Sequence, residues 1–123
     1  MKYTFRLKNK KVFKYVLRNG KYYIGDNIVV HVTKTKNNIN NDIVNNKSFF
    51  AVCVSKKNGN SVMRNKLKRW AREAYKLEEE SLKKGYNIIV LYKKTVKVEN
   101  TSFKDILNDL KDCFCKLDIY ENK

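Results

Sequence analysis

The sequence predicts an α+β fold, an α/β sandwich in which three helices cover a mixed sheet of about four strands. Stretches with the apolar spacing of a helix alternate with runs of β-branched and aromatic residues. The helical stretches are 10–18, 61–84 and 102–116, and the strand-like runs are 27–34, 48–55 and 86–92. Between 48 and 92 the order is strand, helix, strand, which is typical of a βαβ unit. No linker or repeat interrupts residues 1–123, so we expect a single domain.

The helix over 10–18 is predicted by four apolar residues that share one face. These are Val12, Phe13, Val16 and Leu17. Asn19-Gly20 follows as a stop signal, because both residues tolerate the backbone turn that ends a helix.

Two strand-like runs follow, NIVVHVTK and SFFAVCVS, separated by an Asn-rich segment, 36–47. We interpret that segment as an exposed hairpin loop or as the ragged ends of two strands. A further short strand over 22–25 would extend the sheet.

The helix over 61–84 has two chemically opposite faces. Its apolar face follows an i, i+4, i+7, i+8, i+11 pattern, formed by Met63, Leu67, Trp70, Ala71 and Ala74. Its polar face spans an arc of roughly 140° at about 100° per residue. That face carries Arg64, Asn65, Lys68, Arg69, Arg72 and Lys76, with Lys66 between the two arcs. Asn60 or Ser61 is the expected N-cap, and Gly85 the expected residue after the helix end.

The charges on this helix are segregated by sign. The chain has 28 Lys and Arg against 12 Asp and Glu, a net charge of +16, and positions 64–72 hold no acid. A solvated charged face is the alternative interpretation, but such faces normally mix signs so that i, i+4 neighbours support each other. The segregation favours a polyanionic partner, either nucleic acid or an anionic membrane surface.

The run YNIIVLY, 86–92, predicts a strand buried on both faces. Thr101 or Ser102 is expected to cap the last helix, whose apolar face is formed by Phe103, Ile106, Leu107, Leu110 and Phe114. The same helix carries Asp105, Asp109 and Asp112. They could form a metal site, but we favour a solvated face on which they pair with Lys104, Lys111 and Lys116.

Catalytic and metal-binding groups are scarce. His31 is the only histidine and lies in a predicted strand without clustered acids, so no nucleophile–base pair can be assigned. The three cysteines, Cys53, Cys113 and Cys115, lack zinc-site spacing and fit inert thiols in a reducing cytoplasm. We therefore expect no catalytic residue, metal or cofactor in the chain itself.

The lack of long apolar segments argues against a membrane-bound protein. No apolar run approaches the ~18 residues that span a bilayer. The N-terminal MKYTFRLKNKK lacks the apolar region of a secretory signal, so we expect a cytoplasmic protein.

RNA is favoured over duplex DNA as the polyanion. A major-groove reader usually shows a helix-turn-helix or a dimerising zipper, and neither pattern is present. Phe13 and Leu17 share a helix face that either packs in the core or offers a platform for unstacked bases, and His31 could lie beside it. Some of the nearby aromatic residues could also stack on RNA: Tyr3, Phe5, Tyr15, Tyr22 and Tyr23.

The block AVCVSKKNGNSVMRNKLKRWAREAY, residues 51–75, resembles the characteristic region of the bacterial ribonuclease P protein component. That family's pattern is a strand ending in Ser-Lys-Lys, a Gly-Asn turn, and then Ala-Val-x-Arg-Asn-Arg-x-(Lys/Arg)-Arg. The matches are Ser55, Lys56, Lys57, Gly59, Asn60, Val62, Arg64, Asn65, Lys68, Arg69 and Arg72. Upstream, residues 8–21 resemble the family's first helix through Phe13, Val16 and Gly20.

This chain departs from the family pattern at four positions. Lys66 replaces the second motif arginine, which keeps the charge but loses bidentate geometry. Leu17 stands where the family often has Phe, His31 where some members have an aromatic residue, and Ser61 where Ala is usual.

The resemblance implies a fold and a role. The family fold has a left-handed βαβ crossover. A large RNA subunit, with magnesium ions, hydrolyses precursor tRNA at its 5′ end, and the protein assists. The implied RNA-subunit contacts are Lys56, Lys57, Asn60, Arg64, Asn65, Lys66, Lys68, Arg69 and Arg72. The implied cleft for the 5′ leader is lined by Phe13, Val16, Leu17 and His31. The implied stoichiometry is one protein per RNA.

Two other functions remain as alternatives. A generic structured-RNA-binding or ribosomal protein would bind RNA without preferring precursor over mature tRNA. A protein-only nuclease would cleave without an RNA subunit, which the scarcity of histidine and clustered acids disfavours.

Overall fold

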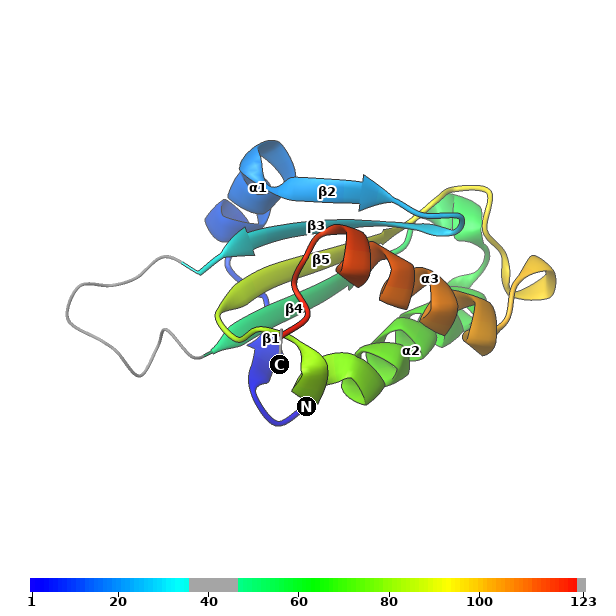
Figure 1. The fold of residues 1–123 in the computed structure, drawn as a ribbon. Coiled ribbons are helices and arrows are strands. Elements are labelled where there is room, and N and C mark those ends of the chain that lie inside the picture. Colours follow the sequence, from blue (N-terminus) through cyan, green and yellow to red (C-terminus); the bar gives the residue numbers. More distant parts are fainter. Residues whose placement is uncertain (36–46, 122–123) are drawn as a thin grey trace.

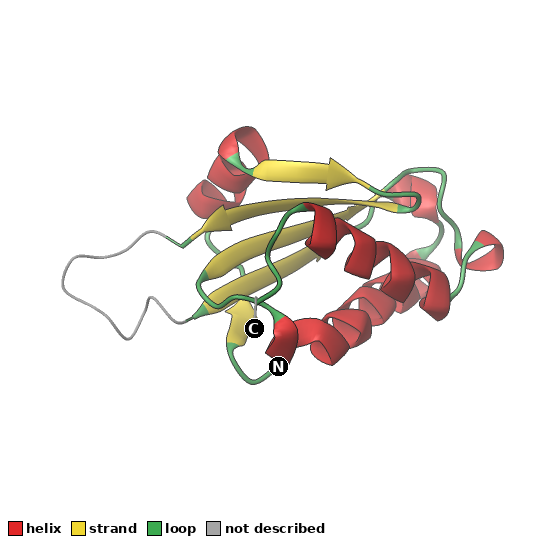
Figure 2. Cartoon of the chain, in the orientation of Figure 1, coloured by secondary structure: helices red, strands yellow, loops and turns green. Residues whose placement is uncertain are grey.

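The computed structural model describes residues 1–35 and 47–121, which form a five-stranded mixed sheet with three α-helices (Figures 1 and 2). The strands are β1 Thr4–Arg6, β2 Lys21–Ile24, β3 Ile28–Lys34, β4 Ser48–Cys53 and β5 Tyr86–Tyr92. The helices are α1 Lys10–Asn19, α2 Ser61–Glu78 and α3 Phe103–Lys116. Three 3-10 turns are η2 Lys56–Asn58, η3 Glu79–Ser81 and η4 Val98–Asn100. The strand order is β1-β4-β5-β3-β2.

Side-chain alternation gives the sheet two different faces. Val30 of β3, Phe50 of β4 and Ile88 of β5 point into the main core, where α2 and α3 pack in front of the sheet (Figure 1). Thr33 of β3 and Asn87 of β5 have the opposite parity, and α1 packs over β3 and β5 on that face. The molecule is therefore a three-layer arrangement, with α1 alone covering part of the second face.

The βαβ unit has the left-handed crossover that the family resemblance implies. Strands β4 and β5 are neighbours and parallel, and α2 connects them. In Figure 1, α2 lies in front of the sheet, β4 and β5 run from left to right, and β5 lies above β4. A right-handed connection would place β5 below β4 in this view, so the crossover runs against the usual hand.

The fold class is confirmed, and two details of the sheet differ from the sequence expectations. The sheet has five strands rather than about four, because the short β1 pairs in parallel with the first half of β4. Strands β3 and β4 cannot form a hairpin, because β5 lies between them. Residues 36–46, most of the Asn-rich segment that connects these strands, lie outside the described residues.

The basic helix is shorter than the predicted 61–84. It ends at Glu78, and after η3 the backbone of Leu82 is extended. The C-terminal segment supplies the hydrogen bonds that a longer helix would have made: Lys83 N–H donates to the Ile119 carbonyl, and Glu121 N–H to the Ser81 carbonyl. Gly85 does not end the helix, but its φ of 85° forms the turn into β5.

Two of the three α3 carboxylates lie on the solvated face that we favoured, but Asp109 does not. Asp109 is only 6% exposed, and its carboxylate accepts hydrogen bonds from the backbone N–H groups of Asp26, Asn27 and Ile28 at 2.8–3.0 Å. Asp105 and Asp112 are exposed. Asp109 therefore ties the β2–β3 turn to α3.

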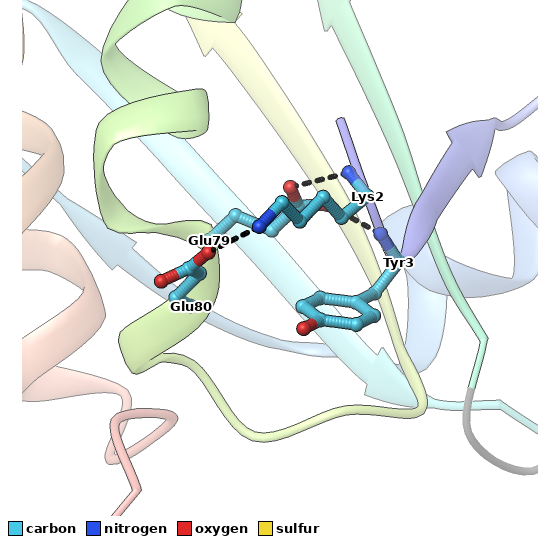
Figure 3. A network of polar contacts seen from close by, with 4 residues as sticks. All are labelled: Lys2, Tyr3, Glu79 and Glu80. Atoms are coloured by element: carbon cyan, nitrogen blue, oxygen red, sulfur yellow. Dashed lines mark hydrogen bonds and ion pairs between the residues drawn. The ribbon is translucent and has the colours of Figure 1, made fainter.

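The N-terminal segment is fixed to the end of α2 by Glu79 (Figure 3). The Glu79 carboxylate accepts hydrogen bonds from the backbone N–H groups of Lys2, at 2.7 Å, and Tyr3, at 3.1 Å. Burial raises the pKa of Glu79, but the Thr4 hydroxyl and these two N–H donors outweigh it, so the net pKa is lowered. The side chain of Lys2 also reaches Glu80 in an exposed ion pair.

Replacing Glu79 with glutamine is expected to lower the free energy of unfolding at neutral pH by about 1.5–3 kcal/mol, the value of hydrogen bonds to a charged group. A carboxyl group whose pKa is lower in the folded state stabilises the fold at pH values above its unfolded-state pKa. This stabilisation is lost as the pH falls through the folded-state pKa. The wild-type chain should therefore lose stability below the ordinary glutamate pKa of 4.5 more steeply than Glu79→Gln does. Urea unfolding as a function of pH measures this difference.

The matched control is Glu80→Gln, because the Lys2–Glu80 pair is exposed and should contribute less than about 0.5 kcal/mol. Equal pH profiles for the Glu79 and Glu80 variants would contradict the assignment.

Candidate nucleic-acid interface

The loop before α2 is held rigidly by a buried asparagine. Asn58 is fully buried, and its Nδ2 donates to the carbonyls of Lys93 and Val96, both at 2.8 Å. Its Oδ1 accepts the backbone N–H of Ser55 at 2.9 Å. Lys56 and Lys57 are exposed on this loop. From the sequence, Asn58 is only one member of a Lys-Lys-Asn-Gly turn, a typical place for a turn-forming residue, and not a predicted site residue.

The start of α2 is equally well defined. Gly59 has a φ of 130°, which disfavours any other residue, and a Cβ there would lie 2.9 Å from the Met63 sulfur. Asn60 is the N-cap, and its Oδ1 accepts the Met63 N–H at 2.9 Å. Asn60 therefore has a structural role in addition to the RNA contact that the resemblance implies.

The two faces of α2 lie as the sequence predicts. Leu67, Ala71 and Ala74 are buried against the sheet and α3. Asn65, Lys66 and Arg69 are exposed, and Arg64, Lys68 and Arg72 are partly exposed. Lys66 places its Nζ 5.4 Å from the centre of the Trp70 ring, so it lies between the faces.

Within the described residues, no acid forms an ion pair with the cations of α2 between Arg64 and Arg72. The ion pairs of α2 that are present involve Glu73 with Lys76 and Glu78 with Lys111. The Nε of Arg64 is buried and has no protein partner in the described part of the chain. Uncompensated like charges of this kind destabilise a free chain and are stabilised by an anionic partner.

A cavity of about 370 Å³ joins this basic face to α1. Strand β1 covers β4 only as far as Phe50, so beyond Phe50 no strand of the described residues pairs with this side of β4. Lys68 and Arg72 border the cavity from α2, and Phe13 borders it from α1. Arg6, which the sequence analysis did not identify, completes the basic lining.

On the far face of the sheet, α1 and β3 bring the predicted cleft residues together in part. Phe13 and Leu17 are partly exposed on one flank of α1. Ala51, Ile89 and His31 form one row across β4, β5 and β3, and Phe13 borders the same cavity as Ala51. Val16 has no exposed surface, because it lies on the buried side of α1. It therefore cannot contact RNA as the resemblance implies.

His31 belongs to an aromatic pair. Its ring stacks on Tyr22 of β2, with ring centres 5.4 Å apart and planes at 28°. Tyr22 is 60% exposed and extends the cleft surface to the sheet edge. Burial lowers the pKa of His31, so the ring is neutral at pH 7 and offers a flat surface rather than a charge.

The described residues contain no group of three or more His, Cys, Asp or Glu side chains able to hold a metal ion. The three cysteines are free thiols. Burial raises the pKa of Cys113 to about 12, and burial also raises that of Cys53. No helix in residues 1–35 or 47–121 has the length and hydropathy of a membrane span.

Comparison with known proteins gives one consistent family. The family model described as ribonuclease P matches residues 1–118. The ribonuclease P protein component of Clostridium botulinum strain Langeland is 34% identical over 116 residues, which covers 94% of this chain and 96% of that protein. The Clostridioides difficile protein of the same name is 31% identical over 117 residues, covering 94% of each chain.

Solved structures agree. The RNase P protein from Staphylococcus aureus superposes with a TM-score of 0.75 at 24% identity, over 97% of this chain and 98% of that one, and shows the same fold. The Thermotoga maritima RNase P protein gives a TM-score of 0.71 at 26% identity, over 88% and 93%. The basic helix, the left-handed crossover and the match along nearly the whole chain lead to one conclusion: this chain is a member of the ribonuclease P protein family.

Proposed function

We propose that this chain binds the catalytic RNA of ribonuclease P through α2 and the preceding loop, and holds the 5′ leader of precursor tRNA in the cleft beside α1. The holoenzyme would then be an endoribonuclease that releases the leader and forms the mature tRNA 5′ end. One observation carries this proposal. The uncompensated cations of α2 and the aromatic cleft are continuous through the cavity where Lys68, Arg72 and Phe13 meet.

The chemical step is assigned to the RNA subunit with magnesium ions. The sequence has one histidine, and its stacked, partly buried ring on the cleft floor suits contact with a base better than proton transfer. The chain's own groups act on binding and orientation. Arginine and lysine side chains neutralise phosphates, and Tyr22, His31 and Phe13 provide flat surfaces for unpaired bases.

The side chains that line the cleft should accept leaders of different sequence. Stacking is tolerant of sequence because every base has a flat face, and a neutral His31 adds no fixed charge. The leader would lie between these rings and the cationic end of the cavity, which holds the precursor more tightly than mature tRNA. We place one protein on each RNA, in the cytoplasm.

Reconstitution with a bacterial ribonuclease P RNA tests this function. At low magnesium, where an RNA subunit alone binds precursor poorly, adding the chain should stimulate precursor-tRNA cleavage by at least about tenfold, because added cations offset phosphate repulsion. Cleavage by the chain without RNA would favour a protein-only nuclease. RNA binding with no stimulation and no preference for precursor over mature tRNA would favour a generic RNA-binding protein.

Replacing Tyr22 with alanine is expected to weaken binding of precursor tRNA by the holoenzyme about 5- to 100-fold, since base–aromatic stacking contributes about 1–3 kcal/mol per base. Binding of mature tRNA should not change, because it has no leader. Fluorescence titration with precursor and mature tRNA measures both affinities.

The matched variant is Tyr22→Phe, which keeps the ring and removes only the hydroxyl. It should bind precursor like the wild type. A loss in Tyr22→Phe as large as in Tyr22→Ala would show that the hydroxyl, and not the stacked ring, matters.

A further inference from the structure

The other flank of α1 borders two pockets outside the proposed leader cleft, of which one shares Arg6 with the cavity beside α2. Val12 lies on the opposite side of Val16 from Phe13 and Leu17, so these pockets face away from the leader cleft. One has a volume of about 430 Å³ and the other about 330 Å³, the size of small-molecule sites. Val12 and Asn87 border both, so the two pockets adjoin, and together we name them the Asn87 pocket.

Asn87 is an incompletely paired polar group in this apolar setting. It lies on β5 between core-facing neighbours, so alternation directs its side chain to the α1 face. The residue is 5% exposed, and its Nδ2 donates to the Thr33 hydroxyl at 3.2 Å. Its Oδ1 is buried and accepts no hydrogen bond from any described residue. An unpaired buried acceptor destabilises the protein, and a ligand that donates a hydrogen bond there would remove that cost.

The lining combines basic and aromatic side chains. Among the described residues, four cations and no acid border the two pockets: Arg6, Lys8, Lys11 and Lys34. Phe49 contributes an aromatic wall, and its ring lies 6.1 Å from that of Phe5, which is 48% exposed. The Nζ of Lys47 lies 5.1 Å from the centre of the Phe5 ring, which adds a cation at the same rim.

We propose that the Asn87 pocket binds an unpaired nucleotide of RNA. The base would pack against Phe49 and Val12 and donate an N–H to the Asn87 Oδ1, and lysines at the rim would bind its phosphate. A nucleotide has a flat ring, an N–H donor and an anionic phosphate. These match the aromatic and apolar wall, the unpaired Asn87 Oδ1 and the lysines of the lining. The choice of RNA rests on the proposed function, whereas the pocket itself can be tested without it.

Adenosine monophosphate is the probe for the pocket. Titration of the isotope-labelled full chain, followed by NMR, should shift the side-chain amide signals of Asn87 and the backbone signals of Thr33 and Phe49. A single nucleotide should bind with a dissociation constant of about 1 mM, as expected for so small a ligand. Ribose 5-phosphate, which lacks the base, should leave the Asn87 side-chain signals in place.

Three further samples separate the contacts. N6,N6-dimethyl-AMP cannot donate from its amino group and should bind about tenfold more weakly, the value of one hydrogen bond. Asn87→Ala should weaken AMP binding by a similar factor, followed through the Thr33 and Phe49 signals, with circular dichroism showing that the variant is folded. Asn108→Ala, an exposed asparagine of α3 on the other face of the sheet, should bind AMP like the wild type. Equal shifts with AMP and ribose 5-phosphate, or no loss in Asn87→Ala, would overturn the proposal.

Photo-crosslinking in the assembled holoenzyme identifies the source of the nucleotide. The photoreactive residue p-benzoylphenylalanine is placed at the exposed Lys8, with a control at Lys104 of α3. A crosslink to the precursor leader or to the RNA subunit supports the proposal and names the source. A crosslink to neither, above the Lys104 control, overturns RNA as the occupant. Failure here with normal cleavage in the reconstitution would leave the proposed function standing.

Discussion

Replacing Arg64 and Arg69 together with alanine is expected to lower the affinity for ribonuclease P RNA roughly 50-fold at about 0.1 M salt. Each phosphate contact contributes a slope of about −0.9 in log affinity against log salt, which is worth roughly eightfold per contact at that concentration. Both side chains lie on the α2 face, where no described acid neutralises them. Binding titrations between about 50 and 200 mM salt should therefore show a slope smaller by about 2 for the double variant.

The control must remove the same charge from another place. Lys104 and Lys116 are exposed on α3, and their replacement with alanine gives the same net charge as the arginine double variant. If position and not total charge determines RNA binding, this control should lose less than about threefold and keep most of its salt slope. Equal losses in the two double variants would show that the whole molecule, rather than the α2 face, attracts RNA.

The two faces of α2 could be predicted from sequence because each depends on local periodicity. The apolar spacing from Met63 to Ala74 predicts which side chains are buried. The absence of acids over 64–72 predicts that the exposed face is cationic. The helix end could not be predicted in the same way. Lys83 and Glu121 complete their hydrogen bonds with segments nearly 40 residues away, which no local pattern contains.

Long-range pairing also explains the other differences. Strand β1 has three residues and forms only because β4 offers an edge, and Val16 is buried only because α1 packs on β3 and β5. Tyr22 lies beside His31 because of the register in which β2 pairs with β3. Local sequence identified the aromatic residues near the cleft, but the strand register decides which of them present a ring to a partner.

Replacing Asp109 with asparagine is expected to lower the free energy of unfolding by about 2–4 kcal/mol. The change keeps the shape of the side chain, so no cavity is formed. It removes the charge and turns one acceptor oxygen into a donor facing N–H groups, which leaves buried donors unpaired. The Asp109 oxygens lie 2.8–3.0 Å from three backbone nitrogens, those of Asp26, Asn27 and Ile28. Urea unfolding at fixed phosphate concentration measures the loss, because phosphate itself would stabilise so basic a chain.

Asp112→Asn is the matched control, since Asp112 is exposed on the same helix and should change stability by less than about 0.5 kcal/mol. The two variants also separate the two parts of the interface. The turn that Asp109 holds connects β2 to β3 and so sets the Tyr22–His31 pair, whereas Asn58 fixes the start of α2 independently. At temperatures where the variant is still folded, Asp109→Asn should weaken precursor binding more than RNA-subunit binding. Equal weakening of both would show that the sheet edge and α2 loosen together as one unit.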